Sequence, residues 1–142
     1  MKKRMILWMF AAVLAIAGLT SCNTSTEDGD WEPMKWSAEQ EFSMDNDYYV
    51  IPAEGATVSF VCKNYGAPWL SDAATGGRYY LPNYETGDYN NIRGDWFKAT
   101  TFQERLTVTF TENTATDRYL SVTVTAGDIF FSFLFKQKGC KN

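Results

Sequence analysis

The stretch that decides the fold is YLSVTVTAGDIFFSFLFK, residues 119–136. In its first half, Leu120, Val122 and Val124 alternate with polar residues, and alternate positions of its second half are again apolar. This period of two is typical of a β-strand with one buried face. The two halves are separated by Ala126-Gly127-Asp128, which has the residues of a tight turn. The stretch therefore predicts two neighbouring antiparallel strands joined as a hairpin.

The same alternation recurs earlier in the chain, between other turn-forming segments. Its apolar positions are Val58, Phe60 and Cys62 in one run and Leu106, Val108 and Phe110 in another. After the N-terminal apolar run, no segment has the period of an amphipathic helix. Repeated short strands at this spacing predict an all-β fold in which two sheets pack face to face as a sandwich.

The N-terminus has the three parts of a secretory signal peptide. Basic residues 2–4 precede an apolar run over residues 5–19, which is shorter than the roughly 20 residues of a permanent membrane span. The run ends in Leu19-Thr20-Ser21-Cys22, which resembles the lipobox of bacterial lipoproteins. We therefore predict a helical signal peptide over residues 1–21 and a lipid attached through the sulfur of Cys22.

The charge of the chain excludes one class of partner. The chain has 13 Lys and Arg against 17 Asp and Glu, and removal of the three basic residues of the signal leaves 10 against 17, a net charge of −7. Binding to nucleic acid takes clustered basic residues, so no nucleic-acid partner is expected. The lipid must then hold the protein to the membrane. Residues 22–41 are predicted to form a lipidated polar tether, and the expected location is the outer membrane, at its periplasmic face or on the cell surface.

Six short motifs, taken in order, resemble those of the BACON domain. They are Val50–Phe60, Asn64–Trp69, Asp95–Lys98, Glu112–Arg118, Ser121–Thr125 and Phe135–Gly139. The BACON domain is an immunoglobulin-like sandwich that is common in exported Bacteroidetes proteins and is named for a proposed role in carbohydrate binding. The resemblance covers residues 42–139 and implies an immunoglobulin-like antiparallel β-sandwich of about seven strands. It also implies binding to a glycan or mucin, but it transfers no ligand-contacting residues, because the family has no agreed set.

The chain departs from the BACON pattern in a tyrosine-rich insertion at about residues 71–94. The insertion lies between Trp69 and Trp96, whose indoles are expected to fill the space between the sheets. Long loops are often functional, and tyrosine mixed with Asn, Gly and Arg is typical of binding loops. One interpretation is therefore a glycan site, and the other is an extra hairpin whose tyrosines pack against the flank of the sandwich. The candidate ligand-binding residues are Tyr79, Tyr80, Tyr84, Tyr89, Arg78 and Arg93.

The residue types that most catalytic and metal sites need are scarce. The chain has no histidine, which removes the commonest general base and metal ligand. Apart from Cys22, its cysteines are Cys62 and Cys140, which lack the spacing of zinc ligands. In an exported protein they either form one disulfide or remain a buried thiol and a free thiol near the C-terminus. Neither a metal nor a cofactor is expected.

Three classes of function remain. The leading hypothesis is a lipid-anchored, non-catalytic envelope protein that binds a glycan or mucin. The alternative is a structural or protein-interaction module of an envelope complex, which would use the apolar face of Phe130 and Leu134. A glycosidase would need a pair of carboxylates such as Glu85 and Asp88. Acidic residues in a polar loop are ordinarily solvated, so the protein is not expected to be an enzyme.

Overall fold

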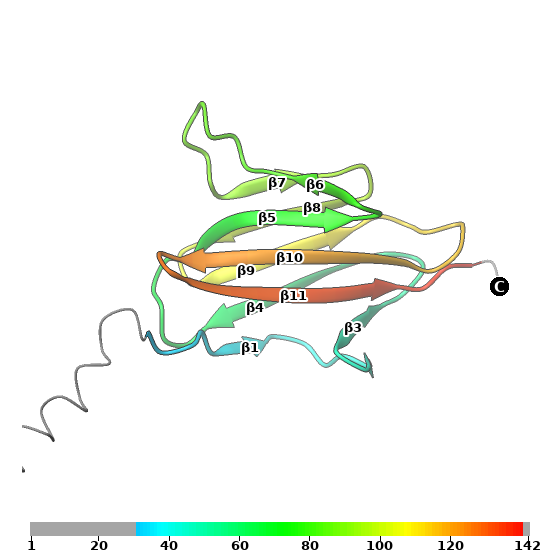
Figure 1. Ribbon diagram of the computed structural model, residues 1–142. Helices are drawn as coiled ribbons and strands as arrows, with labels where there is room; N and C mark the ends of the chain where they lie inside the picture. The colour runs from blue at the N-terminus through cyan, green and yellow to red at the C-terminus, as the bar shows by residue number, and fades with distance from the viewer. Residues whose placement is uncertain (1–30, 141–142) are drawn as a thin grey trace, which may run out of the picture. The chain divides into compact units, whose positions relative to one another are not determined.

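The computed structural model describes residues 31–140, and within them the chain forms two β-sheets and no helix (Figure 1). The strands are β1 (Trp36–Ala38), β2 (Met44–Asp45), β3 (Tyr48–Ile51), β4 (Ala56–Cys62), β5 (Trp69–Thr75), β6 (Arg78–Tyr80), β7 (Asn91–Arg93), β8 (Phe97–Phe102), β9 (Arg105–Phe110), β10 (Arg118–Ala126) and β11 (Ile129–Gln137). Sheet A has the order β1-β4-β9-β8-β7, and sheet B has the order β2-β3-β11-β10-β5-β6. The predicted all-β sandwich is confirmed.

The strand order is that of an immunoglobulin-like sandwich. The neighbours β4-β9-β8 in sheet A and β5-β10-β11 in sheet B correspond to the B-E-D and C-F-G strands of that fold. Seven of the described strands have four or more residues, as expected, and the four shorter ones (β1, β2, β6 and β7) lie toward the sheet edges. The expectation of wholly antiparallel sheets is wrong at one place, because β3 pairs with β11 in parallel.

The predicted hairpin is the longest pair of strands in the described part of the chain. In β10 and β11 the register places Val122 opposite Phe133 and Leu120 opposite Phe135, and all four side chains are buried between the sheets. Sheet A contributes Phe60 from β4, whose ring centroid lies 4.6 Å from that of Phe133. The core therefore follows from the alternation in the sequence, because every second residue of each strand faces the other sheet.

A glycine makes the connection from sheet B to sheet A possible. Gly55 lies in the turn between β3 and β4 and has a φ of +94°, which residues with a side chain rarely adopt. A Cβ atom at this position would lie 2.5 Å from the carbonyl oxygen of Phe110. The sharp turn expected at Gly55 thus has two reasons, the backbone conformation and the close approach of β9.

The folded unit begins earlier than predicted. It extends from Pro33, and the side chain of Met34 is buried in the core. Residues 36–38 form β1, in which Trp36 pairs with Cys62. The predicted tether boundary at residue 41 is therefore wrong, because these apolar side chains pack onto the sandwich. The predicted signal peptide, Cys22 and the tether up to residue 30 lie outside the described residues. No helix in the described part is long and apolar enough to cross a membrane.

Cys62 and Cys140 are free thiols in the structure, so the predicted disulfide is absent. The alternative prediction, a buried thiol and a free thiol near the C-terminus, is the correct one. Cys62 is buried at the end of β4, and Cys140 is exposed just after β11. The end of β11 pairs with Ile51, immediately before the turn into β4, so Cys140 lies near the start of β4. At about 3.3 Å per residue, the length of β4 separates the two thiols by roughly 20 Å.

The tyrosine-rich insertion is shorter than predicted, because residues 69–75 form β5, a central strand of the fold. Within β5 the side chain of Leu70 is buried, whereas Trp69 is 38% exposed. Neighbouring residues of a strand point to opposite faces, so only one of the two can enter the core, and the inward indole predicted at Trp69 is wrong. Trp96 does pack against the core as expected.

Candidate functional site

The outer faces of the two sheets have different chemistry. On sheet A, hydroxyl groups of neighbouring strands pair across the surface, as in Thr57 with Thr109 and Ser59 with Thr107. On sheet B, one such pair joins Thr123 and Ser132, and the surface also carries exposed aromatic side chains, among them Tyr79 and Tyr119. Exposed aromatic clusters are typical of interaction surfaces, so sheet B is the face on which a site is expected.

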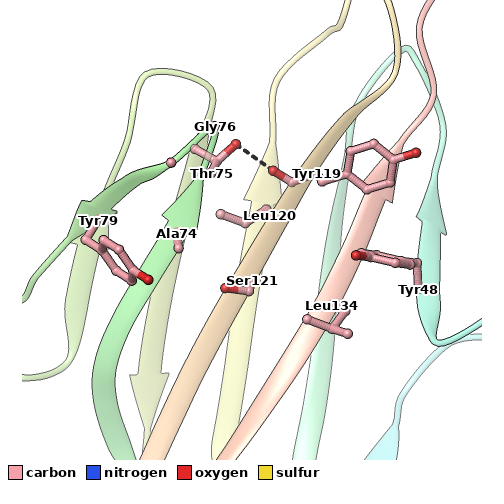
Figure 2. Close-up of a pocket in the computed structure, with 10 residues that line it drawn as sticks. Tyr48, Ala74, Thr75, Gly76, Tyr79, Tyr119, Leu120, Ser121 and Leu134 are labelled. Atoms are coloured by element: carbon pink, nitrogen blue, oxygen red, sulfur yellow. Dashed lines mark hydrogen bonds between the residues drawn. The ribbon is translucent and has the colours of Figure 1, made fainter.

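An open groove of about 270 Å³ crosses this face of sheet B (Figure 2). Its floor is made of the small or aliphatic residues Ala74, Ser121 and Leu134. Tyr79 stands on one side of this floor, and Tyr119 and Tyr48 stand on the other (Figure 2). We call this feature the tyrosine groove.

Strand register places the walls of the tyrosine groove. Tyr79 is opposite Ala74, Ala74 is opposite Ser121, and Ser121 is opposite Leu134, so one row of residues runs across four adjacent strands. Tyr48 lies on β3, the strand beyond β11. With strands about 4.8 Å apart, Tyr79 and Tyr48 are roughly 19 Å apart, which suits an elongated ligand.

Local contacts fix the side of the groove where Tyr119 stands. The rings of Tyr119 and Tyr48 meet edge to face, with their centroids 5.2 Å apart. The backbone carbonyl oxygen of Tyr119 accepts a hydrogen bond of 2.5 Å from the hydroxyl of Thr75 (Figure 2). Gly76 and Gly77, both with positive φ, then turn the chain back from β5 into β6, which carries Tyr79.

A charged cluster borders the groove next to Tyr119. Lys136 is opposite Tyr119 in the hairpin, and its Nζ donates a hydrogen bond of 2.6 Å to Oδ2 of Asp45. Asp117 lies 3.7 Å from the same nitrogen. The hydrogen bond from Lys136, together with its charge, lowers the pKa of Asp45, and the same hydrogen bond raises the pKa of Lys136. Both groups therefore stay ionised at neutral pH and offer a polar edge to a ligand in the groove.

The six candidate residues predicted from the sequence do not form one site. Tyr79 is 71% exposed and lines the tyrosine groove. The next residue, Tyr80, turns to the other face and packs edge to face on the buried ring of Phe97, 5.3 Å away, with the guanidinium of Arg78 over it at 5.0 Å. For Tyr80 the alternative of a tyrosine packed on the flank is therefore the right one.

The other three candidates lie in two further places. Tyr84 and Tyr89 are exposed on the loop of residues 81–90, with their ring centroids 5.4 Å apart. Arg93 is in β7 of sheet A and borders a separate hollow of about 340 Å³ with Asp95 and Lys98. That hollow has no exposed aromatic ring, so it lacks the flat apolar surface of the tyrosine groove.

The sequence interpretation missed Tyr48 and Tyr119 as site residues. The signal for Tyr119 was present, because it alternates with Leu120 and therefore had to face away from the core. Tyr48 had no such signal, since its strand β3 is only four residues long.

One carboxylate of the loop, that of Asp88, has structural partners. Asp88 accepts hydrogen bonds from the backbone N–H of Asn90 and from the side-chain amide of Asn91. Asn90 in turn accepts a hydrogen bond of 2.7 Å from the hydroxyl of Thr101 in β8. These contacts hold the loop against sheet A. Within residues 31–140 no group of three or more Cys, Asp or Glu side chains is arranged to hold a metal ion.

Comparison with models of known protein families finds no match, and comparison with curated proteins finds none either. Among solved structures, the chain is similar to a protein from Bacteroides thetaiotaomicron determined by NMR, with a TM-score of 0.68 and 31% sequence identity. The similarity covers 85% of this chain and 99% of the other chain. Identity at this level over nearly the whole of the other protein reflects common descent as well as a common fold. The chain therefore belongs to the same protein family as this Bacteroides thetaiotaomicron protein.

Proposed function

We propose that the protein is a lipid-anchored, non-catalytic component of the bacterial outer membrane that binds carbohydrate in the tyrosine groove. The proposal combines the lipobox at Cys22 and the resemblance to the BACON domain with one structural observation. That observation is the row of small floor residues between the exposed ring of Tyr79 on one side and the exposed Tyr119 and half-buried Tyr48 on the other.

The chemistry of the groove suits a glycan. The C–H faces of a sugar ring are apolar and pack well on aromatic rings, while its hydroxyl groups need hydrogen-bond partners. The tyrosine rings supply the flat surfaces, and Ser121 and the Lys136–Asp45 pair supply polar groups nearby. The groove is open along the sheet instead of enclosed, which favours part of a long chain such as a polysaccharide or mucin glycan over a small metabolite.

A non-catalytic role agrees with how the acidic side chains are used. Asp88, one of the two carboxylates named for a glycosidase, holds its own loop together. Asp45 is paired with Lys136 at the border of the groove. Both carboxylates are thus engaged in contacts within the fold, and the tyrosines supply most of the surface that meets a ligand.

Glycan binding should depend on the groove tyrosines and not on the loop tyrosines. In calorimetry with a glycan selected from an array, we expect Tyr119→Ala or Tyr79→Ala to weaken binding at least about tenfold, equivalent to about 1.4 kcal/mol. Each variant removes an exposed ring and no core contact. The matched control is Tyr84→Ala, which removes an equally exposed ring from residues 81–90 and should leave the affinity unchanged. Loss of binding in Tyr84→Ala alone would place the site on the loop. The proposal would be refuted if the unmodified chain bound no glycan.

Lipid attachment should depend on one sulfur. When bacteria expressing the chain are fed a radioactive or clickable fatty acid, the protein should become labelled, and Cys22→Ser should remove the label completely. Cys140→Ser is the control, because Cys140 is also an exposed thiol and its loss should leave the label intact. A Cys22→Ser protein that still carries the fatty acid would contradict the predicted anchor.

A further inference from the structure

Six of the exposed large apolar side chains of the folded unit lie toward one end of the sandwich. Phe102 is 74% exposed and Phe130 is 60% exposed, although they lie in different sheets. We define the apolar rim as Trp69, Leu81, Tyr84, Tyr89, Phe102 and Phe130. Large apolar side chains that are this exposed at one end of a domain suggest a surface that a partner covers.

The topology brings the members of the apolar rim to the same end. Phe102 is the last residue of β8, and Phe130 is the second residue of β11, next to the hairpin turn. Trp69 begins β5, and the loop joins it there, because the N–H of Leu70 donates a hydrogen bond of 2.8 Å to the carbonyl oxygen of Tyr89. In Figure 1 the start of β5, the β10–β11 turn and the loop after β6 all lie at the left.

The N-terminal part of the chain joins the folded unit at this same end. Trp36, the first residue of β1, pairs with Cys62, the last residue of β4. β1 therefore begins where β4 ends and where β5 begins. Cys22 precedes Pro33 by eleven positions, so even a fully extended connection spans at most about 40 Å. A lipid on Cys22 would thus keep this end of the domain within about 40 Å of the bilayer.

We propose that the apolar rim rests on the lipid surface and places its aromatic side chains in the headgroup region of the membrane. The inference rests on the lipid anchor of the proposed function. Trp and Tyr favour this region because each ring has an apolar body and a polar tip, and Phe and Leu add apolar area. The charged side chains at this end are of both signs, and they include the exposed Lys63, Glu104 and Asp128. The attraction is therefore apolar, and it does not need anionic lipid.

This orientation separates the two surfaces of the protein. Tyr119 precedes Thr125 by six positions on β10, and Thr125 is the residue opposite Phe130. At about 3.4 Å per residue, the Tyr119 side of the tyrosine groove lies roughly 20 Å from Phe130. The Tyr79 side lies nearer to the rim, two residues from Leu81. A domain seated on the rim would keep the Tyr119 side of the groove away from the bilayer, in the space in which a glycan can approach.

Quenching of tryptophan fluorescence by brominated lipid tests the orientation. The chain from Cys22 to Asn142, with Cys140→Ser, is coupled through Cys22 to a maleimide lipid in phosphatidylcholine vesicles. Coupling by chemistry makes the result independent of whether cells lipidate Cys22, so failure of the rim and failure of the anchor are distinguishable. Trp69 belongs to the rim, and Trp96 lies at the start of β8, at the opposite end. The contribution of each is obtained by difference, from Trp69→Phe and Trp96→Phe.

We expect brominated lipid to quench Trp69 at least roughly twofold more than Trp96, because only the rim reaches the acyl boundary. The triple variant Tyr84→Ser, Phe102→Ser and Phe130→Ser should remove this difference while Trp69 stays in place. The matched variant Tyr79→Ser with Tyr119→Ser, which removes exposed rings from the groove, should keep it. Equal quenching of both tryptophans, or a triple variant that behaves like the unmodified chain, would overturn the proposal. So would a rim that joins two copies of the chain, seen as a dimer in sedimentation of the uncoupled protein.

Discussion

Replacing Phe60 with Ala is expected to lower the free energy of unfolding by about 3–5 kcal/mol, the usual cost of removing a buried aromatic ring. Phe60 is fully buried in β4 of sheet A. Its ring lies between the sheets, with centroids 4.6 Å from Phe133 and 6.0 Å from Phe135 in β11, and it stacks on Phe42 at 5.5 Å. The substitution therefore leaves a cavity where the two sheets meet. Small domains are stable by about 5–15 kcal/mol in total, so the loss is a large part of the whole.

The change is measured by urea denaturation, followed through tryptophan fluorescence. The control is Phe102→Ala, which removes the same side chain from a position that is 74% exposed. Its effect should stay within about 0.5 kcal/mol, as for most surface substitutions. If Phe60→Ala and Phe102→Ala lower the free energy of unfolding equally, the burial of Phe60 does not explain its contribution to stability.

The central hairpin could be predicted from the sequence because a strand with one buried face has a local pattern in which apolar residues alternate with others. In β10 and β11, residues that face the core alternate with residues that face outward, over strands of nine residues each. The short strands have no such alternating pattern. β1 has three residues, too few to establish a period, and it was assigned to the tether even though Trp36 packs on Phe133 in the core.

The candidate site was less predictable, because its residues meet only in the folded sheet. Tyr48, Tyr79 and Tyr119 come from β3, β6 and β10, which are distant in the sequence. The tyrosine-rich segment is a contiguous run in the sequence, but composition does not determine the direction in which each ring points. Within β6 the two adjacent tyrosines separate, Tyr79 to the groove and Tyr80 to Phe97. A shift of one residue in a strand changes the face that a side chain occupies, so a site on a sheet needs the register before its members can be named.

Replacing Asn113 with Leu is expected to lower the free energy of unfolding by about 2–4 kcal/mol, because buried polar groups of the backbone would lose their partners. The side chain of Asn113 is buried, and its amide donates hydrogen bonds to the carbonyl oxygens of Thr116, at 2.8 Å, and Lys138, at 3.1 Å. Its side-chain oxygen accepts a hydrogen bond from the N–H of Ala115. This residue thus joins the turn between β9 and β10 to the segment that follows β11.

The turn is predicted to depend on Asn113 because the side-chain amide of this residue is buried, and not only because asparagine favours turns. Asn83 provides the comparison, because its side-chain oxygen also accepts backbone hydrogen bonds in a turn, from Glu85 and Thr86, but it is exposed. In Asn83→Leu, water can replace the lost partners, so the expected cost is below about 1 kcal/mol. Denaturation of the two variants side by side decides the matter. Equal losses would show that turn propensity alone accounts for both asparagines, whereas a much larger loss for Asn113→Leu means that this buried amide fastens the two ends of the β10–β11 hairpin to the rest of the sandwich.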